Sequence, residues 1–202
     1  METLDFTRSH RALYTATDRV KPVEAGTASF LAVEGEGPPG QPAHEAAIHR
    51  LFELVWAAKL ALEYGGILDF KVPPLECLWL SDPTIAPHAP WRWRLMMRLP
   101  DAVTEAQLAG PRRYVEARKG FDTAEIRRRT FTEGHAVQTL HTGPYGEEAG
   151  AYARLDAYAG ERGLTLSGVG HDIYLSDPDR VAAERLRTII RLQVSTKRPL
   201  VE

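Results

Sequence analysis

The sequence predicts a mixed α+β fold in which two βαββ repeats follow one another along the chain. Three observations predict it. Strand-like and helix-like apolar patterns occur in the same order in both halves, glycine follows the main helical segment of each half, and the tetrapeptide Leu-Ser-Asp-Pro occurs once in each half. The spacing of these repeats is too long for a solenoid, and the agreement of order and letters indicates a duplicated unit.

The first half shows a short apolar run, then a segment of helical period, then two further strand-like segments. Gly65-Gly66 follows the helical segment and is expected to end the helix. Pro73-Pro74 interrupts the next strand, which predicts a bend or an edge position there. The expected strand, helix, strand and strand cover residues 27–34, 44–64, 67–80 and 91–99.

A connecting helix joins the halves, and the second half then repeats the order of elements. Residues 104–119 predict this helix, with a weak point at Gly110-Pro111. The first strand of the second half is expected to turn through Glu133-Gly134 into another strand. The expected strands and helix of this half cover residues 126–132, 135–142, 147–162, 169–176 and 186–194.

These patterns predict one domain with a short extension at each end. In this interpretation each main helix covers one face of its own antiparallel sheet, and the remaining surfaces enclose a ligand cleft beside a pseudo-two-fold axis. The N-terminal extension is expected to be an extended arm. The arm, first repeat, connection, second repeat and C-terminal tail are expected at about residues 1–25, 26–100, 101–125, 126–195 and 196–202.

The composition argues against several classes of protein. A formal net charge of −2 gives no long-range attraction to nucleic acid. Cys77 is the only cysteine, so the chain can form neither an intramolecular disulfide nor a cysteine-based metal site. The N-terminus lacks the pattern of a signal peptide, and no apolar stretch approaches the length of a membrane span. We therefore expect a cytoplasmic protein without a direct nucleic-acid or membrane partner.

Motifs for metal and cofactor chemistry are also missing from the sequence. It contains no His-Glu-x-x-His, no phosphate-binding glycine loop followed by Lys-Ser/Thr, and no Gly-x-Ser-x-Gly. His44 and His49 are too far out of phase to share a helix face. No metal and no cofactor are expected.

Short motifs in both halves resemble a known family. The second half contains a His-Thr-Gly-Pro-Tyr run that opens a helix, an Asp-Ile-Tyr-Leu strand and a closing Thr-Ile-Ile-Arg strand. The chain resembles the GyrI-like small-molecule-binding family over about residues 26–195, and its first half resembles the stand-alone branch, which has no DNA-binding part. The motifs that carry the resemblance lie at 34–38, 74–79, 93–100, 104–105, 141–145, 163–164, 171–178 and 188–191.

The resemblance implies a tandem βαββ fold with a ligand cleft on the pseudo-two-fold axis. Relatives serve as sensor domains of multidrug-responsive transcription regulators, as a DNA gyrase inhibitor and, in the stand-alone branch, as hydrolases that open the cyclopropane of cyclopropanoid genotoxins. It therefore implies that the chain binds a hydrophobic or cationic aromatic small molecule and can hydrolyse a reactive one. The alternatives are a non-catalytic sensor or sequestering protein and an interaction protein resembling the gyrase inhibitor.

The strand around Asp172 supplies the first candidate acid. Strict alternation places Asp172 and Tyr174 on one face and Ile173 and Leu175 on the other. The apolar pair is expected to meet the helix, so that the carboxylate and the phenol point into the cleft. In the family a Glu commonly occupies the place of Asp172.

The first half supplies a second acid, whose register is open. Glu76 and Trp79 match the family motif. However, when the two Ser-Asp-Pro turns are aligned, Trp79 corresponds to Tyr174. In the same alignment Asp172 corresponds to Cys77 and not to Glu76. A one-residue bulge near Pro73-Pro74 would remove the mismatch, because a slip of one residue turns each side chain to the other face.

Together these residues predict an aromatic and acidic cleft. Rings provide stacking and cation–π attraction, and a desolvated carboxylate can accept a proton from water. Some members have structural alternatives. A tryptophan can belong to the core, and Glu76 can be an ordinary surface or edge-strand acid. Asp172 can pair with His171, and His141 can be a structural histidine. The catalytic candidates are Glu76, Asp172 and Tyr174, and the ligand-binding candidates are Trp79, Trp91, Trp93, Met96, Tyr145 and His141.

Overall fold

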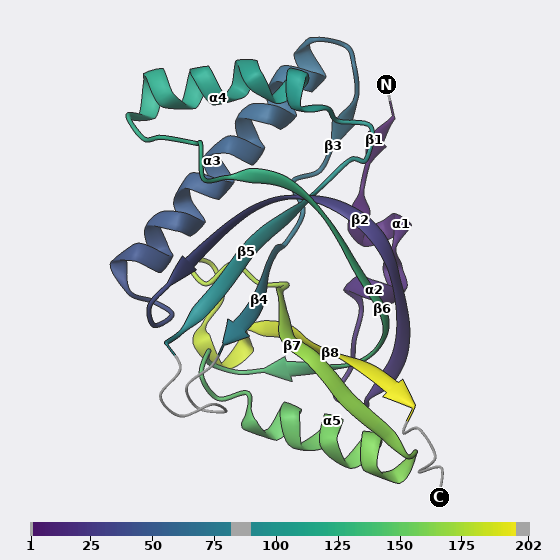
Figure 1. The fold of residues 1–202 in the computed structure, drawn as a ribbon. Helices are drawn as coiled ribbons and strands as arrows, with labels where there is room; N and C mark the ends of the chain where they lie inside the picture. Colours follow the sequence, from purple (N-terminus) through teal and green to yellow (C-terminus); the bar gives the residue numbers. More distant parts are fainter. Residues whose placement is uncertain (1, 82–89, 197–202) are drawn as a thin grey trace, which may run out of the picture. The chain divides into compact units, whose positions relative to one another are not determined.

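The computed structural model of the chain describes residues 2–81 and 90–196. Its strands are β1 (Thr3–Leu4), β2 (Lys21–Glu36), β3 (Asp69–Phe70), β4 (Leu75–Ser81), β5 (Arg92–Leu99), β6 (Arg127–Thr142), β7 (Leu164–Tyr174) and β8 (Arg187–Thr196). Its helices are α1 (Phe6–Ser9), α2 (Arg11–Tyr14), α3 (Pro42–Tyr64), α4 (Glu105–Lys119) and α5 (Ala149–Glu161), with a 3-10 turn at Ala183–Arg185. Helices and antiparallel strands together confirm the predicted α+β class (Figure 1).

The chain divides into two compact units. Unit 1 comprises Met1–Ser9 and Ala28–Phe131, and unit 2 comprises His10–Thr27 and Thr132–Glu202. Unit 1 contains residues 28–36 of β2, then α3, β4 and β5, and unit 2 contains residues 132–142 of β6, then α5, β7 and β8. Residues 21–27 of β2 belong to unit 2, and residues 127–131 of β6 belong to unit 1. The order strand, helix, strand, strand therefore occurs in each unit.

Unit 1 is built on an antiparallel sheet in which β5 lies between β2 and β4. α3 packs on the face of this sheet that carries Trp93, Leu95 and Met97, all nearly or fully buried. α4 lies alongside α3, and a capping box formed by Thr104 and Gln107 starts α4 (Figure 1). The connection between the predicted repeats is thus part of this unit.

Unit 2 has the same strand order, with β8 between β6 and β7. α5 packs on the sheet face that carries Val137 and Ile190, and these residues form an apolar cluster with Ala151 and Leu155 of the helix. Each of the four is at most 1% exposed. Burial of such apolar side chains is the main force that holds a helix to a sheet.

Several expected features agree with the structure. α3 ends at Tyr64 as the glycine pair predicts. The predicted strand is interrupted at Pro73-Pro74, which separates β3 from β4. The weak point expected at Gly110-Pro111 does not interrupt α4, which runs through Pro111. Asp82 and Pro83 of the first Ser-Asp-Pro turn lie outside the described residues.

Two expectations were wrong. The turn predicted at Glu133-Gly134 is not a turn, because β6 continues through it and Gly134 adopts a φ of +73° inside the strand. The N-terminal arm is not extended, because Phe6 and Tyr14 are buried and anchor the short helices α1 and α2. β2 also begins earlier than expected, at Lys21.

Gly35 is required by the packing of unit 1. The indole of Trp93 lies directly over Gly35 on the neighbouring strand, and a Cβ at this position would come within 2.2 Å of the ring. Trp93 cannot easily move away, because it is 2% exposed and its Nε1–H donates to the carbonyl of Gly37 at 3.1 Å. A side chain at residue 35 would therefore displace a core ring.

We predict that Gly35→Ala lowers the free energy of unfolding by about 1–3 kcal/mol, the usual cost of overpacking a core. Urea unfolding followed by tryptophan fluorescence measures it. Gly26→Ala in the same strand is the control, because a Cβ at Gly26 meets nothing within 4 Å. Equal stabilities of the two variants would contradict the packing described for Trp93.

Candidate functional site

Strand register fixes the facing of Glu76. β4 pairs with β5 without a break from Leu75 opposite Met97 to Trp79 opposite Trp93, and the irregularity comes only after Trp79. Glu76 pairs with Met96, so these two side chains lie on the face opposite α3, whereas Trp79 lies on the α3 side. No bulge shifts Glu76 relative to Trp79.

Register also fixes the facing of Asp172, and the expectation for it was wrong. Asp172 pairs with Ile190, which packs against α5, so Asp172 and Tyr174 lie on the helix side of the sheet. Ile173 pairs with Ile189 on the opposite face, and both are fully buried. The apolar side chain at residue 173 does not meet the helix because this sheet buries apolar residues on both faces.

The two units can be compared row by row from their own pairings. In unit 1 one row of opposed residues is Gly35, Trp93 and Trp79, and in unit 2 the row at the matching place is His141, Thr188 and Tyr174. Counted back along each strand from Trp79 and Tyr174, Cys77 corresponds to Asp172 and Glu76 to His171. Glu76 therefore lies on the sheet face away from the helix of its unit, whereas Asp172 lies on the face toward the helix of its unit.

An aromatic cluster occupies the helix side of unit 1 at the start of α3. The Trp79 ring lies 5.4 Å from that of Trp91, and the His44 ring lies 6.2 Å from Trp79 and 5.0 Å from Trp93. Trp79 and Trp91 are half-buried, but Trp93 is a core residue. The two half-buried rings offer an aromatic surface to a ligand.

His44 supplies a polar atom to this cluster. Burial lowers its pKa, which favours the neutral ring. Nδ1 accepts a hydrogen bond from the Gly40 N–H at 3.4 Å, which assigns the proton to Nε2. Among the described residues Nε2 has no hydrogen-bond partner.

A second aromatic cluster lies on the helix side of unit 2. The rings of Tyr145 and Tyr174 are 5.4 Å apart and nearly perpendicular, and Tyr145 remains 43% exposed. Burial and the nearby acids Asp177 and Glu148 raise the pKa of Tyr145, so its phenol keeps its proton at neutral pH. Phenols in this state can donate a hydrogen bond to a ligand oxygen.

Asp172, Thr188 and His141 lie beside these tyrosines on the same face. Asp172 is 5% exposed and precedes Tyr174 by two residues along β7. The Thr188 hydroxyl, opposite Tyr174, is buried and has no hydrogen-bond partner among the described residues. Nε2 of His141 lies 3.0 Å from the carbonyl of Pro144, which agrees with the structural alternative for this histidine.

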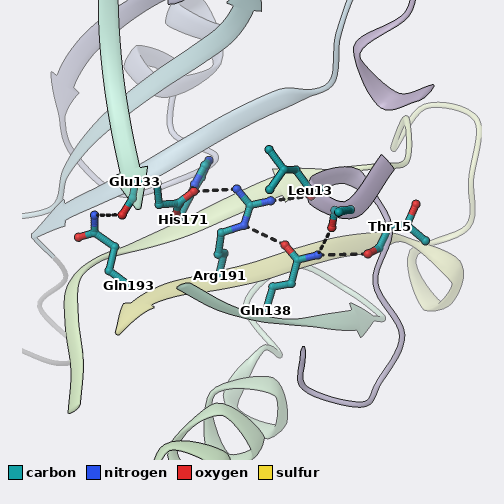
Figure 2. Close-up of polar contacts among 8 residues, drawn as sticks. Leu13, Thr15, Glu133, Gln138, His171, Arg191 and Gln193 are labelled. Carbon is teal, nitrogen blue, oxygen red and sulfur yellow. Dashed lines mark hydrogen bonds and ion pairs between the residues drawn. The ribbon is translucent and has the colours of Figure 1, made fainter. Parts of the chain in front are cut away.

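The face opposite α5 carries a buried polar network instead of rings. The Arg191 guanidinium donates to Glu133 at 2.7 Å and to Gln138 at 2.9 Å, and Nδ1 of His171 lies 2.8 Å from Glu133 (Figure 2). Arg191 also donates to the Leu13 carbonyl at 2.5 Å. The network therefore ties α2 to the sheet of unit 2.

Glu133 is held as an anion inside this network. Burial alone would raise its pKa, but the charges of His171 and Arg191 and the hydrogen bonds from both override burial and lower the pKa from 4.5 to about 2. The Arg191 guanidinium therefore offsets the buried charge of Glu133, and loss of the carboxylate would leave the Arg191 cation buried without this partner.

A sequence profile of the GyrI-like small molecule binding domain family matches residues 28–195, most of the chain. The chain belongs to the GyrI-like family. No curated protein matches the sequence.

Solved structures agree with this GyrI-like assignment. An uncharacterized conserved protein from Listeria innocua is 30% identical, with a TM-score of 0.88, and the match covers 96% of this chain and 100% of that one. A hydrolase from Listeria innocua is 31% identical, with a TM-score of 0.85 and the same coverage. The C-terminal domain of EcmrR shares the fold alone, at 12% identity and a TM-score of 0.60 over 88% of this chain and 98% of that one.

Two features are absent from the described residues of this GyrI-like chain: a membrane-spanning helix and a cluster of metal ligands. None of the helices at residues 2–81 and 90–196 is long and apolar enough to cross a membrane. In the same residues no three His, Cys, Asp or Glu side chains are grouped so that they could hold a metal ion.

Sequence reasoning missed His44, Thr188 and the partners of Arg191. The helical pattern assigns His44 only to the first turn of a helix, and Thr188 looks like an ordinary strand residue. Their neighbours depend on strand register, which the sequence leaves open. An available signal was Glu133 before Gly134, since a glycine inside a strand often marks an irregularity that re-aims a neighbouring side chain.

We predict that Glu133→Gln lowers the free energy of unfolding by about 3 kcal/mol at neutral pH, because Arg191 and His171 lose their carboxylate. The pKa of Glu133 is depressed in the folded state, so its stabilisation is present above the unfolded value of 4.5 and is lost as pH falls toward about 2. The difference between wild type and variant should therefore shrink from neutral pH to about pH 3 in urea unfolding. The exposed Glu147→Gln is the control; a difference that stays constant with pH would contradict the account.

Proposed function

We propose that this GyrI-like protein binds a flat, apolar or cationic aromatic small molecule and hydrolyses a reactive one of the cyclopropanoid type. The observation that carries the proposal is the pair of rings of Tyr145 and Tyr174 beside the buried carboxylate of Asp172. The 31% identity over nearly the whole chain to a structure described as a hydrolase supports the catalytic part. A common origin of the two units by duplication, with a pseudo-two-fold axis, belongs to the same proposal.

The ring pairs of the two units suit the same class of ligand. Trp79 with Trp91, and Tyr145 with Tyr174, each form an edge-to-face pair that leaves ring surface for stacking. A cation over such rings is attracted by their quadrupoles, and a nearby carboxylate adds charge complementarity. Asp172 supplies that charge on the ring-bearing face of unit 2, whereas Glu76 and Met96 lie on the face opposite α3.

The same groups can catalyse the opening of a cyclopropane conjugated to a carbonyl. Asp172 accepts a proton from water as the water oxygen forms a bond to a ring carbon. The carbon–carbon bond of the cyclopropane breaks, and its electron pair moves through the conjugated system to the carbonyl oxygen. The phenol of Tyr174 stabilises the charge on that oxygen, which then takes up a proton.

We predict that Asp172→Asn reduces the rate of ring opening about 100-fold or more, because the amide cannot accept the proton. The change is measured by mass spectrometry with a spirocyclopropyl dienone as substrate. The exposed Asp156→Asn on α5 is the matched control and should keep wild-type turnover. Glu76→Gln should lose less than about threefold, because Glu76 lies on the other type of face; a larger loss for Glu76→Gln than for Asp172→Asn would reverse the assignment.

Binding is tested separately with two dyes of similar shape, the cation ethidium and the neutral phenanthridine. Asp172→Asn should weaken ethidium binding about tenfold more than phenanthridine binding, because only the cation gains from the carboxylate. Equal losses for the two dyes would show that the charge of Asp172 has no part in recognition. Tight binding of intact spirocyclopropyl compound without turnover would favour the alternative, a non-catalytic sensor or sequestering protein.

A further inference from the structure

We propose that unit 1 contains a second binding site, separate from the ring clusters, that takes a small dianion such as a phosphate group or a dicarboxylate. The site is a cavity of about 220 Å³ lined by Ala32, Glu34, Glu125, Arg127 and Arg129. Nothing in the proposed hydrolysis uses these residues. The proposal rests on the cavity and on the balance of charge around it.

The two glutamates of the cavity already have cationic partners. Both Nε and Nη2 of Arg94 donate to Glu34, at 2.9 and 2.7 Å, and Arg50 lies 3.5 Å from Glu125. Each carboxylate charge is therefore matched by a guanidinium from outside the lining. The glutamates shape the wall of the cavity and leave its arginines uncompensated.

Arg127 and Arg129 are the groups that would hold the anion. They are two residues apart on β6, so alternation places both side chains on one face of the strand. Within residues 2–81 and 90–196 neither guanidinium has an ion-pair or hydrogen-bond partner. Two adjacent cations without a counterion repel each other, and a dianion between them removes that repulsion.

The size and chemistry of the cavity select the class of ligand. The cavity of about 220 Å³ has space for a phosphate or a short dicarboxylate. Guanidinium groups bind phosphate and carboxylate through paired N–H donors, which makes arginine better suited than lysine to either anion.

The test is titration calorimetry of the intact chain with inorganic phosphate and, separately, with succinate, at an ionic strength fixed with chloride. Saturable binding of either anion at concentrations below about 10 mM is the expected result. Arg127→Gln and Arg129→Gln should each weaken it about tenfold or more. Arg113→Gln, at an exposed position on α4 away from the cavity, should leave it unchanged.

The outcomes separate the two sources of anion and the competing explanation. Binding of phosphate alone assigns a phosphoryl ligand, and binding of succinate alone assigns a carboxylate ligand. No saturable binding of either, or an equal loss in Arg113→Gln, would overturn the proposal. Arg129→Lys distinguishes the geometry of the guanidinium from its charge. This variant should bind the anion less tightly than wild type but more tightly than Arg129→Gln. Equally weak binding by the Lys and Gln variants, with unchanged circular dichroism spectra, would also overturn the proposal.

Discussion

The antiparallel pairing of β4 with β5, and of β7 with β8, is the constraint on which the account of this protein depends. Successive residues of a strand point to opposite faces, so a shift of one residue would exchange every side chain between the helix side and the other side. The observed registers place Trp79 with Trp93, and Asp172 with Ile190. In unit 1 the rings of Trp79 and Trp93 therefore lie on the sheet face that α3 covers. In unit 2 the Asp172 carboxylate lies on the sheet face that α5 covers.

The same constraint explains the contrast between the two kinds of face. The helix side carries aromatic rings at the start of α3 and just before α5 that are only partly buried. The opposite face of unit 2 is filled by the Arg191, Glu133 and His171 network, whose hydrogen bonds are satisfied by one another and by α2 (Figure 2). Such a network adds rigidity at a high cost of desolvation, so removal of one member leaves a buried charge.

Much of the fold could be predicted from the sequence because periodicity and glycine or proline punctuation are local signals. They identified α3, α5 and the break at Pro73-Pro74. The facing of Asp172 could not be predicted in the same way. The rule that apolar residues meet the helix fails where a sheet is buried on both faces, as at Ile173 and Ile190.

Only part of the candidate site could be predicted from the sequence pattern. The rings of Tyr145 and Tyr174, two separate candidates from the sequence, are in contact, and the correspondence of Trp79 with Tyr174 agrees with the pairings in each unit. The polar atoms of His44 and Thr188 depend on tertiary neighbours that no local pattern specifies. The predicted ligand cleft between the repeats stays a prediction.

Fluorine NMR of the chain labelled with 5-fluorotryptophan tests the central claim most directly, because the four tryptophans report on different surfaces. With ethidium as ligand, the account predicts that the Trp79 and Trp91 resonances shift and that the resonance of Trp56, exposed on α3, stays in place. Assignment comes from single Trp→Phe variants. A shift of Trp56 with no change at Trp79 and Trp91 would contradict the claim that the helix-side rings bind the ligand.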